Sequence, residues 1–231
     1  MSFCRVLIFA PVLLLAGCDR APDRPVEPAS RSGTSAASQP VTGPERHILA
    51  FGNSLFAGYG VGAANSYPAQ LEKALRTQGI NARVVNAGIS GDTTASGRQR
   101  LAFTLDAQMP APDLAILELG ANDMLRALPP AETRANLAAM LDEFAERDIP
   151  VLLMGMRAPP NYGPEYQQAF DAIYADLGKR QGVTLVPFWL ETIYQRPELF
   201  QADRLHPTTE GLGLLVDATK DAVVEALPPA D

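Results

Sequence analysis

The chain has 231 residues, of which 47% are hydrophobic and 19% are charged, and its formal net charge at pH 7 is −7. This length and this apolar content are sufficient for a folded domain with a hydrophobic core. The sequence has no run of basic residues, and a negative net charge opposes binding to a polyanion. Nucleic acid is therefore not an expected partner.

The N-terminus has the pattern of a bacterial export signal. Arg5 supplies a positive charge, and residues 6–16 form an apolar run. This run is shorter than the roughly 20 residues that a membrane-spanning helix needs, so we interpret residues 1–17 as a cleaved signal peptide. The sequence Leu15-Ala16-Gly17-Cys18 resembles the bacterial lipobox, which implies cleavage before Cys18 and attachment of lipid to its sulfur. The alternative is an ordinary signal peptide with an incidental cysteine.

A lipidated Cys18 predicts an exported protein that is anchored to a bacterial membrane, with its folded part in the periplasm or at the cell surface. Residues 18–45 are rich in Pro, Ser, Ala, Gly and Thr, with few large apolar side chains. Such a segment buries too little apolar surface to fold, so we expect a flexible tether. Cys4 would leave with the signal, and Cys18 would then have no intramolecular disulfide partner.

Residues 46–227 are expected to form one domain in which strands and helices alternate. Five apolar runs are predicted to be strands: His47–Phe51, Ala82–Asn86, Leu114–Leu119, Val151–Met154 and Val183–Pro187. Apolar residues at helical spacing predict helices around four groups: Leu71 and Leu75; Leu137, Met140, Leu141 and Phe144; Phe170, Ile173, Tyr174 and Leu177; Leu212, Leu215, Val216, Thr219 and Val223. Gly79 and Gly182 are predicted to end helices in a left-handed conformation. This alternation predicts an α/β domain, a parallel sheet of about five strands with helices on both faces.

The loops after these strands carry the residues that could perform chemistry. The carboxyl ends of parallel strands share one edge of a sheet, so residues of different loops can converge there. The candidate loops are Gly52-Asn53-Ser54, Asn86–Asp92, Gly120–Asp123 and Asp203–His206.

A serine nucleophile needs a base within hydrogen-bonding reach and a third group that orients the base. The chain has two histidines, and His47 begins the first strand at the opposite edge from Ser54. His206 is therefore the candidate base, and Asp203 can fold back through one turn to accept from its ring. With no cluster of Cys and His ligands, we expect no metal and no cofactor.

Acyl transfer also needs donors for the oxyanion. The candidates are the N–H groups of Ser54 and Gly88 and the side-chain amide of Asn122. Each residue has a structural alternative: Gly88 as a turn glycine, Asn122 in an Asx-turn, and Asp203 with His206 in a surface loop. All of these alternatives would have to hold at one sheet edge for the site to be absent.

Gly52-Asn53-Ser54-Leu55, Gly88, Gly120–Asp123 and Asp203–His206 together resemble the four sequence blocks of the SGNH (GDSL-type) hydrolases. Three further segments resemble the branch of thioesterase I/lysophospholipase L1 and the arylesterases: Gly58-Tyr59-Gly60, Ser90–Thr94 and Met156–Gly163. The resemblance covers about residues 47–226.

This resemblance implies a three-layer flavodoxin-like fold, with Ser54 as nucleophile, His206 as base and Asp203 as its partner. It also implies an oxyanion hole made by Ser54, Gly88 and Asn122. One departure is Asn53, where the family usually has Asp. A carboxylate beside an imidazole favours its charged form, so the acidic limb of activity should lie at lower pH here than in an Asn53→Asp variant.

We therefore predict a serine esterase that hydrolyses aryl, acyl or thio esters of small substrates. An alternative for the same site is a carbohydrate or peptidoglycan O-acetylesterase. An alternative from another class is a catalytically silent, ligand-binding lipoprotein with Asn53 as the mark of decay, against which the intact Ser54, Asp203 and His206 argue. The sequence defines no oligomeric state, and a monomer is the simplest expectation.

Overall fold

A computed structural model describes residues 41–229 of the chain. The expected signal peptide (1–17), the expected lipid site at Cys18 and most of the expected tether (18–45) lie outside the described residues. No helix within residues 41–229 is long and apolar enough to cross a membrane.

The described residues form one five-stranded parallel sheet with the strand order β2-β1-β3-β4-β5. The strands are β1 (Arg46–Gly52), β2 (Ala82–Gly88), β3 (Leu114–Glu118), β4 (Val151–Met154) and β5 (Val183–Val186). All five predicted strands are present, and their ends differ by up to two residues. β2 is longer than predicted because it stays in register with β1 as far as the pair Gly52 and Gly88.

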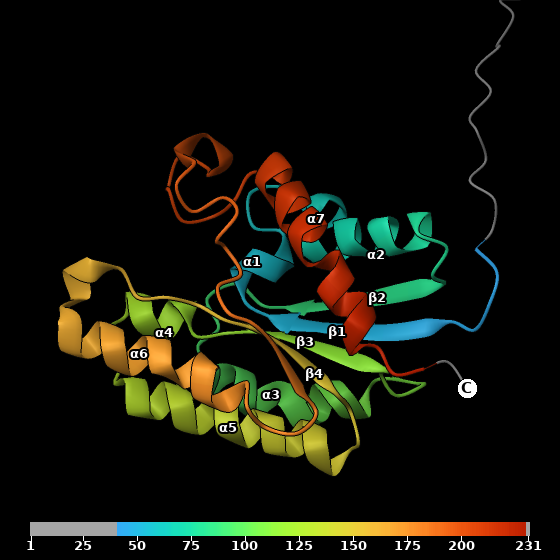
Figure 1. Cartoon of the computed structure of the whole chain (residues 1–231), viewed down its shortest axis with the longest axis horizontal. Coiled ribbons are helices and arrows are strands. Elements are labelled where there is room, and N and C mark those ends of the chain that lie inside the picture. Colours follow the sequence, from blue (N-terminus) through green and yellow to red (C-terminus); the bar gives the residue numbers. More distant parts are fainter. Residues whose placement is uncertain (1–40, 230–231) are drawn as a thin grey trace, which may run out of the picture. The chain divides into compact units, whose positions relative to one another are not determined.

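Helices cover both faces of the sheet, which confirms the three-layer α/β/α fold (Figure 1). One face carries α2 (Tyr67–Thr77) and α7 (Thr209–Ala226), and the other carries α3 (Thr94–Asp106), α5 (Pro130–Glu146) and α6 (Pro164–Leu177). The shorter helical elements are α1 (Ser54–Ala57), η1 (Ala63–Asn65), α4 (Ala121–Leu125), η2 (Pro160–Tyr162) and η3 (Pro197–Leu199).

The core lies between the sheet and these helices. All of the apolar residues used to predict α2, α5, α6 and α7 are buried, as are residues 48–51 of β1 and every residue of β3. Full burial of one large apolar side chain stabilises a fold by roughly 1.5–3 kcal/mol. The apolar stripes therefore fix how these four helices pack.

Helix α3 has no apolar stripe that would predict it. Its buried face consists of Thr94, Gly97, Leu101 and Leu105, so only two large apolar residues mark it. A Cβ atom on Gly97 would lie 2.4 Å from Leu119 Cδ1, so the close approach of α3 to the sheet requires a glycine there. This small residue is invisible to a search for apolar periodicity.

The two glycines expected to end helices have different places. Gly79 follows α2 with a φ of 85°, as predicted. Gly182 also has a positive φ, of 77°, but it leads into β5, and α6 ends earlier at Leu177. The prediction for Gly182 as a helix cap was wrong, because three further residues turn the chain between Gly178 and Gly182.

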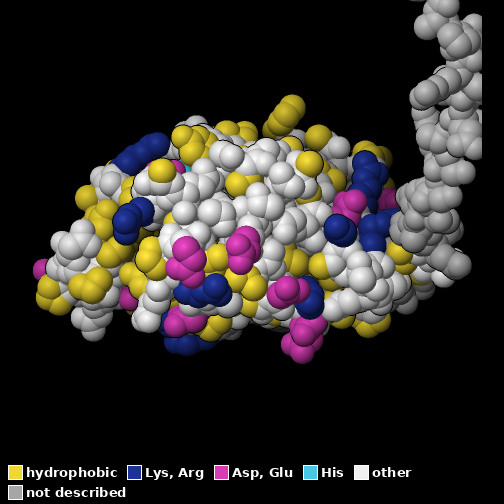
Figure 2. Space-filling model, turned by 90° about the horizontal axis from the view of Figure 1, so that it is seen from above, with side chains coloured by type: hydrophobic (Ala, Val, Ile, Leu, Met, Phe, Trp, Pro, Cys, Tyr) yellow, Lys and Arg dark blue, Asp and Glu magenta, His cyan; other side chains and the backbone are white. Residues whose placement is uncertain are grey.

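The surface over α2 and α7 carries charges of both signs. Figure 2 shows Lys and Arg side chains beside Asp and Glu side chains on this side of the molecule. On α7, Lys220 and Asp217 form an ion pair of 2.6 Å. Mixed charges of this kind favour solubility and produce no strong field of one sign.

Candidate active site

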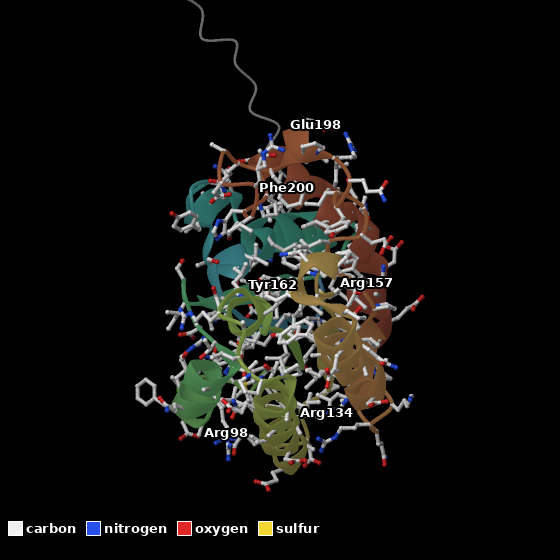
Figure 3. The ribbon with its side chains drawn as sticks, turned by 90° about the vertical axis from the view of Figure 1, so that its left-hand side faces the viewer. Arg98, Arg134, Arg157, Tyr162, Glu198 and Phe200 are labelled. Carbon is white, nitrogen blue, oxygen red and sulfur yellow. The ribbon has the colours of Figure 1, made fainter. Side chains whose placement is uncertain are left out.

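A cavity of about 730 Å³ lies at the edge of the sheet where the strands end. The segments that follow all five strands contribute to its wall. Its lining includes Ser54 after β1, Gly91 after β2, Asn122 after β3, Met156 after β4, and Phe188 and His206 after β5. Figure 3 looks onto this edge and shows Arg157 and Phe200, two further lining residues, on the segments after β4 and β5.

Ser54 lies just after the C-terminal end of β1, where a tight turn leads into α1. Asn53 is the N-cap of this short helix, and its Oδ1 accepts from the Leu55 N–H at 3.0 Å. The same Oδ1 lies 3.4 Å from the Ser54 hydroxyl. A capping residue of this type satisfies an amide that would otherwise lack a partner, so the turn has a defined geometry.

His206 and Asp203 reach this serine from the far end of the chain. His206 Nε2 lies 2.8 Å from Ser54 Oγ, and His206 Nδ1 lies 2.7 Å from Asp203 Oδ2. The other Asp203 oxygen accepts from the backbone N–H groups of Leu205, at 2.9 Å, and His206, at 3.0 Å. The structure thus brings the three residues together in one hydrogen-bonded chain.

The carboxyl of Asp203 is held in its ionised form. The backbone N–H of His206 is the largest cause that lowers the pKa of Asp203 to about 2. Partial burial opposes this shift, and the Leu205 N–H and the His206 ring add to it. A carboxylate that accepts several N–H bonds is expected to stay charged well below neutral pH.

Gln201 connects the loop that carries His206 to the loop that follows α1. Its side-chain amide donates to the Tyr59 carbonyl at 2.8 Å and to the Pro207 carbonyl at 2.9 Å. Gly60 makes room for this contact, because a Cβ there would lie 2.0 Å from Gln201 Oε1. The two halves of the site are therefore tied together beside His206.

Asn122 and Asp123 lie in the first turn of the short helix α4, which follows β3. The Asn122 side-chain amide donates to the Asp92 carbonyl at 2.9 Å, with its second N–H still available to the cavity. Asp123 is buried and accepts from the N–H and hydroxyl of Thr94, at 2.8 and 2.5 Å. Asp123 therefore docks this loop onto the start of α3 and fixes the place of Asn122.

The expectation that Gly88 donates to an oxyanion does not agree with the structure. The Gly88 N–H already donates to Asn86 Oδ1 at 2.9 Å, and Gly88 does not line the cavity. A Cβ at Gly88 would lie 2.5 Å from the Ala57 N atom, so this glycine is required by its packing against α1.

Gly91, three residues later, lines the cavity instead. None of the hydrogen bonds among residues 41–229 uses its N–H group. Its φ of 87° needs a glycine. The sequence does offer a signal, since Gly91 belongs to the same Asn86–Asp92 loop, but a strand that ends at Asn86 makes the nearer glycine the natural choice.

Among the described residues, the other titratable groups lie away from Ser54 or form no metal site. His47, at the start of β1, pairs through its ring with Glu45 and lies at the opposite edge from Ser54, as predicted. Within the part of the chain that the structure describes, no group of three or more His, Cys, Asp and Glu side chains could hold a metal ion.

A family model described as GDSL-like lipase/acylhydrolase matches residues 50–213 of the chain. An arylesterase of Vibrio mimicus is 39% identical over 193 residues, which cover 84% of this chain and 94% of that protein. Thioesterase 1/protease 1/lysophospholipase L1 of Escherichia coli K12 is 38% identical over 170 residues, 74% of this chain and 79% of that protein.

Solved structures agree with the sequence relatives. The crystal structure of AlinE4, a SGNH-hydrolase family esterase, is 58% identical and has a TM-score of 0.69. The similarity covers 81% of this chain and all of that one. Sequence and fold therefore point to the same group of proteins.

Proposed function

This chain belongs to the GDSL-like lipase/acylhydrolase family, the SGNH hydrolases, and we propose that it hydrolyses carboxylic esters with three residues. In this proposal Ser54 is the nucleophile, His206 is the general base and Asp203 orients His206. The relatives named arylesterase and thioesterase/lysophospholipase are carboxylic ester hydrolases, and so is this protein.

The reaction would follow the order of the hydrogen bonds. As Ser54 Oγ attacks the ester carbonyl carbon, His206 Nε2 takes its proton and then gives that proton to the departing alcohol, phenol or thiol. Water hydrolyses the acyl-serine with the same base, and Ser54 is regenerated. Asp203 holds the ring through Nδ1 and stabilises the imidazolium that forms in each half of the reaction.

The negative oxygen of the tetrahedral intermediate would be bound by the N–H groups of Ser54 and Gly91 and by the free N–H of the Asn122 amide. All three residues line the cavity beside His206. Neither the Ser54 nor the Gly91 N–H takes part in a hydrogen bond among the described residues, so both are free to donate. One such donor typically contributes about 3–4 kcal/mol to transition-state stabilisation.

The observation that carries this proposal is the continuous chain from Asp203 Oδ2 to Ser54 Oγ, with distances of 2.7 and 2.8 Å, at the wall of the cavity. In a surface loop with an incidental His and Asp, the imidazole would not be expected to lie within hydrogen-bonding distance of a serine at the end of a buried strand. The same geometry argues against a silent ligand-binding protein.

The cavity favours acyl or aryl groups as substrate. Its wall is dominated by apolar side chains around Ser54, among them Leu55, Met124, Leu125, Met156, Phe188 and Leu190. Apolar walls gain free energy by removing hydrocarbon from water and offer few partners to sugar hydroxyls. An ester with an aryl or medium acyl group therefore fits this site better than an O-acetylated carbohydrate does.

Labelling with a fluorophosphonate tests the nucleophile directly. We expect one equivalent of label on Ser54, identified by mass spectrometry, and loss of turnover by about 10⁶-fold in Ser54→Ala. Ser54→Ala should keep the wild-type circular dichroism spectrum, since only the hydroxyl is removed. Substantial turnover by a folded Ser54→Ala variant would disprove the assignment, and an unlabelled wild-type protein would favour the silent alternative.

The substrate class is tested with p-nitrophenyl esters of rising chain length. We expect kcat/KM to rise from acetate to medium chains as more of the chain is buried in the cavity. A maximum at acetate, with turnover of an acetylated sugar, would favour the carbohydrate O-acetylesterase.

A further inference from the structure

Glu118 is a carboxyl group that the proposed reaction does not use. It is the last residue of β3, and it is completely buried. Its carboxyl oxygens face Asn53, the residue before Ser54: Oε1 accepts from Asn53 Nδ2 at 3.0 Å, and Oε2 accepts from the Asn53 backbone N–H at 3.2 Å. Burial of a carboxyl group is costly unless its oxygens are paired, and both oxygens of Glu118 are paired with Asn53.

The backbone is shaped to let this carboxyl approach the turn. Gly52 is opposite Glu118 in the register of β1 and β3. A Cβ on Gly52 would lie 2.9 Å from Glu118 Oε2 and 2.8 Å from Phe56 Cδ2. Gly52 therefore leaves the space that the carboxyl of Glu118 occupies.

Glu118 and the Leu55 N–H together determine which way the Asn53 amide points. The Glu118 oxygens accept, so the Asn53 NH₂ group must face them. The Asn53 carbonyl oxygen is then left to accept from the Leu55 N–H and to lie beside the Ser54 hydroxyl. If the amide were reversed, an NH₂ group would face the Leu55 N–H and an oxygen would face an acceptor.

We propose that Glu118 is a positioning residue of the esterase site, which acts through Asn53 to hold the turn that carries Ser54. This inference rests on the proposed role of Ser54 as nucleophile. The complementarity of the two positions is what the proposal requires. In the wild type, Glu118 accepts twice, and Asn53 donates with its backbone N–H and its side-chain NH₂ group. Reacting groups lose rate steeply when they are displaced, by about 100-fold for a shift near 1 Å.

The surroundings keep this carboxyl mostly neutral at neutral pH. Burial raises the pKa of Glu118 to about 8, and the two N–H bonds from Asn53 oppose the shift. Tyr174 of α6 is close enough for the Glu118 carboxyl to act on its pKa, and Asp123 of α4 acts on the same tyrosine. Arg100 of α3 contacts Gly52, the residue opposite Glu118 in β1. Burial, followed by the Glu118 and Asp123 carboxyls, raises the pKa of Tyr174, so its hydroxyl stays neutral. Arg100 pairs with Asp92 and donates to the Gly52 carbonyl at 3.0 Å.

Both protonation states of Glu118 preserve the pair. A carboxylate accepts with either oxygen, and a protonated carboxyl can still accept through its carbonyl and hydroxyl oxygens. Titration of Glu118 alone is therefore not expected to lower kcat as pH rises through 8.

Replacing one carboxyl oxygen of Glu118 by an NH₂ group changes the hydrogen bonds with Asn53 and leaves the volume of the side chain almost unchanged. Glu118→Gln keeps the shape but offers one acceptor to two donors, so one N–H of Asn53 meets the new NH₂ group. The double variant Asn53→Asp/Glu118→Gln restores every contact. The new carboxylate at position 53 accepts from the new NH₂ group at position 118 and from the Leu55 N–H. The amide oxygen at position 118 accepts from the backbone N–H of position 53.

Asn53→Asp alone places two carboxyls face to face. They share one proton at low and neutral pH, which maintains a hydrogen bond between them, and they repel once both are ionised. We therefore expect kcat of this variant to fall on the alkaline side, at pH values where wild-type kcat is constant. A merely structural pair would change stability without this pH dependence of turnover.

The experiment measures kcat, KM and the rate of fluorophosphonate labelling of the full chain with p-nitrophenyl butyrate as substrate, at the plateau of the pH profile. We expect Glu118→Gln to lower kcat and the labelling rate by about 10- to 100-fold with KM changed less than about threefold, and the double variant to recover most of kcat. The matched control is Glu72→Gln on α2, whose carboxyl accepts from the Val84 N–H at 2.8 Å away from the cavity. Its kcat should equal the wild-type value.

Wild-type kcat in a folded Glu118→Gln variant would overturn the proposal. If Glu118→Gln does not fold, the double variant decides: a folded, active double variant supports the pair, and an unfolded or inactive one refutes it. Failure of the proposed function is distinguishable, because the wild type would then not be labelled on Ser54. Failure of the Glu118 proposal leaves that label in place and gives wild type and Glu118→Gln equal labelling rates.

Discussion

The ring of Tyr59 lies over the imidazole of His206, with 4.3 Å between the ring centroids and an angle of 33° between the ring planes. Tyr59 follows α1 and is half-exposed at the cavity wall. The face of an aromatic ring attracts a cation, with about 0.5–1 kcal/mol at exposed sites. Tyr59 is therefore expected to stabilise the imidazolium of the proposed mechanism.

Tyr59→Ala is expected to lower kcat by about twofold to fivefold, in line with that interaction energy. Because the protonated ring loses a favourable contact, the acidic limb of kcat/KM should move to lower pH. The measurement is a pH–rate profile of each variant on one ester.

Two controls separate this effect from contact with the substrate. Tyr59→Phe keeps the ring and should resemble the wild type. Tyr194 lines the same cavity with similar exposure but packs against Phe188, so Tyr194→Ala should change KM and leave the acidic limb in place. An acidic limb that is equal in Tyr59→Ala and wild type would show that the stacked ring does not act on the charge of His206.

Asp203 is expected to stay ionised throughout the acidic limb of activity. Its pKa is lowered to about 2, chiefly by the His206 N–H, so Asp203 takes up no proton as the pH falls toward 4 and adds no second protonation to the loss of activity. Log kcat/KM should therefore fall with a slope of one. Since the folded-state pKa is below the unfolded value of about 3.9, the stability from ionised Asp203 is present above pH 4 and is lost as pH falls toward 2.

Asp203→Asn removes this charge while it keeps the side-chain volume. The asparagine can donate to Nδ1 and so favours the wrong tautomer, and a loss of kcat of about 10⁴-fold is expected. The free energies of unfolding of the variant and the wild type, from urea titrations, should converge between pH 4 and pH 2. A difference that stays constant over this range would refute the assigned ionisation.

Asn122→Ala tests the oxyanion hole. Removal of one preorganised donor is expected to lower kcat by about 100- to 1,000-fold with little change in KM. The lost bond to the Asp92 carbonyl is a separate, structural effect, so thermal unfolding is measured as well. A folded variant whose kcat is within about twofold of wild type would remove Asn122 from the proposed hole.

The overall fold and the meeting of Ser54, Asp203 and His206 could be predicted, because apolar runs reveal buried strands and parallel strands end at one edge. Gly88 was expected as an oxyanion donor and Gly91 is now proposed in its place, since the choice depends on where β2 ends and on which N–H is already bonded to Asn86. Glu118 was missed because it sits at the end of an apolar run, where its burial and its bonds to Asn53 depend on the register of β1 and β3. Contacts between distant segments carry no local pattern.

Cys18 and the export signal remain predictions. If Cys18 carries lipid, the wild-type protein expressed in a Gram-negative host should sediment with membranes, and Cys18→Ser should be released into the soluble fraction. A domain that starts at Arg46 should hydrolyse the same ester at a similar rate, because every residue of the proposed site lies after it. Wild-type protein found wholly in the soluble fraction would contradict the lipobox interpretation.

The last prediction concerns how the residue at position 53 affects protonation of the His206 imidazole, and Ser54 connects the two side chains. Asn53 Oδ1 lies 3.4 Å from Ser54 Oγ, and that hydroxyl lies 2.8 Å from His206 Nε2. With Glu118 mostly protonated near pH 6, the wild-type pair 53/118 is close to neutral, and the Asn53→Asp pair with its one shared proton carries one negative charge. This charge favours the protonated imidazole. The base is then free only at higher pH, so the acidic limb of kcat/KM, which reports the free enzyme, should move to higher pH in Asn53→Asp. The Asn53→Asp/Glu118→Gln variant carries the same charge and should show the same shift. Profiles that superimpose on the wild type in both variants would show that a charge at position 53 is screened from His206.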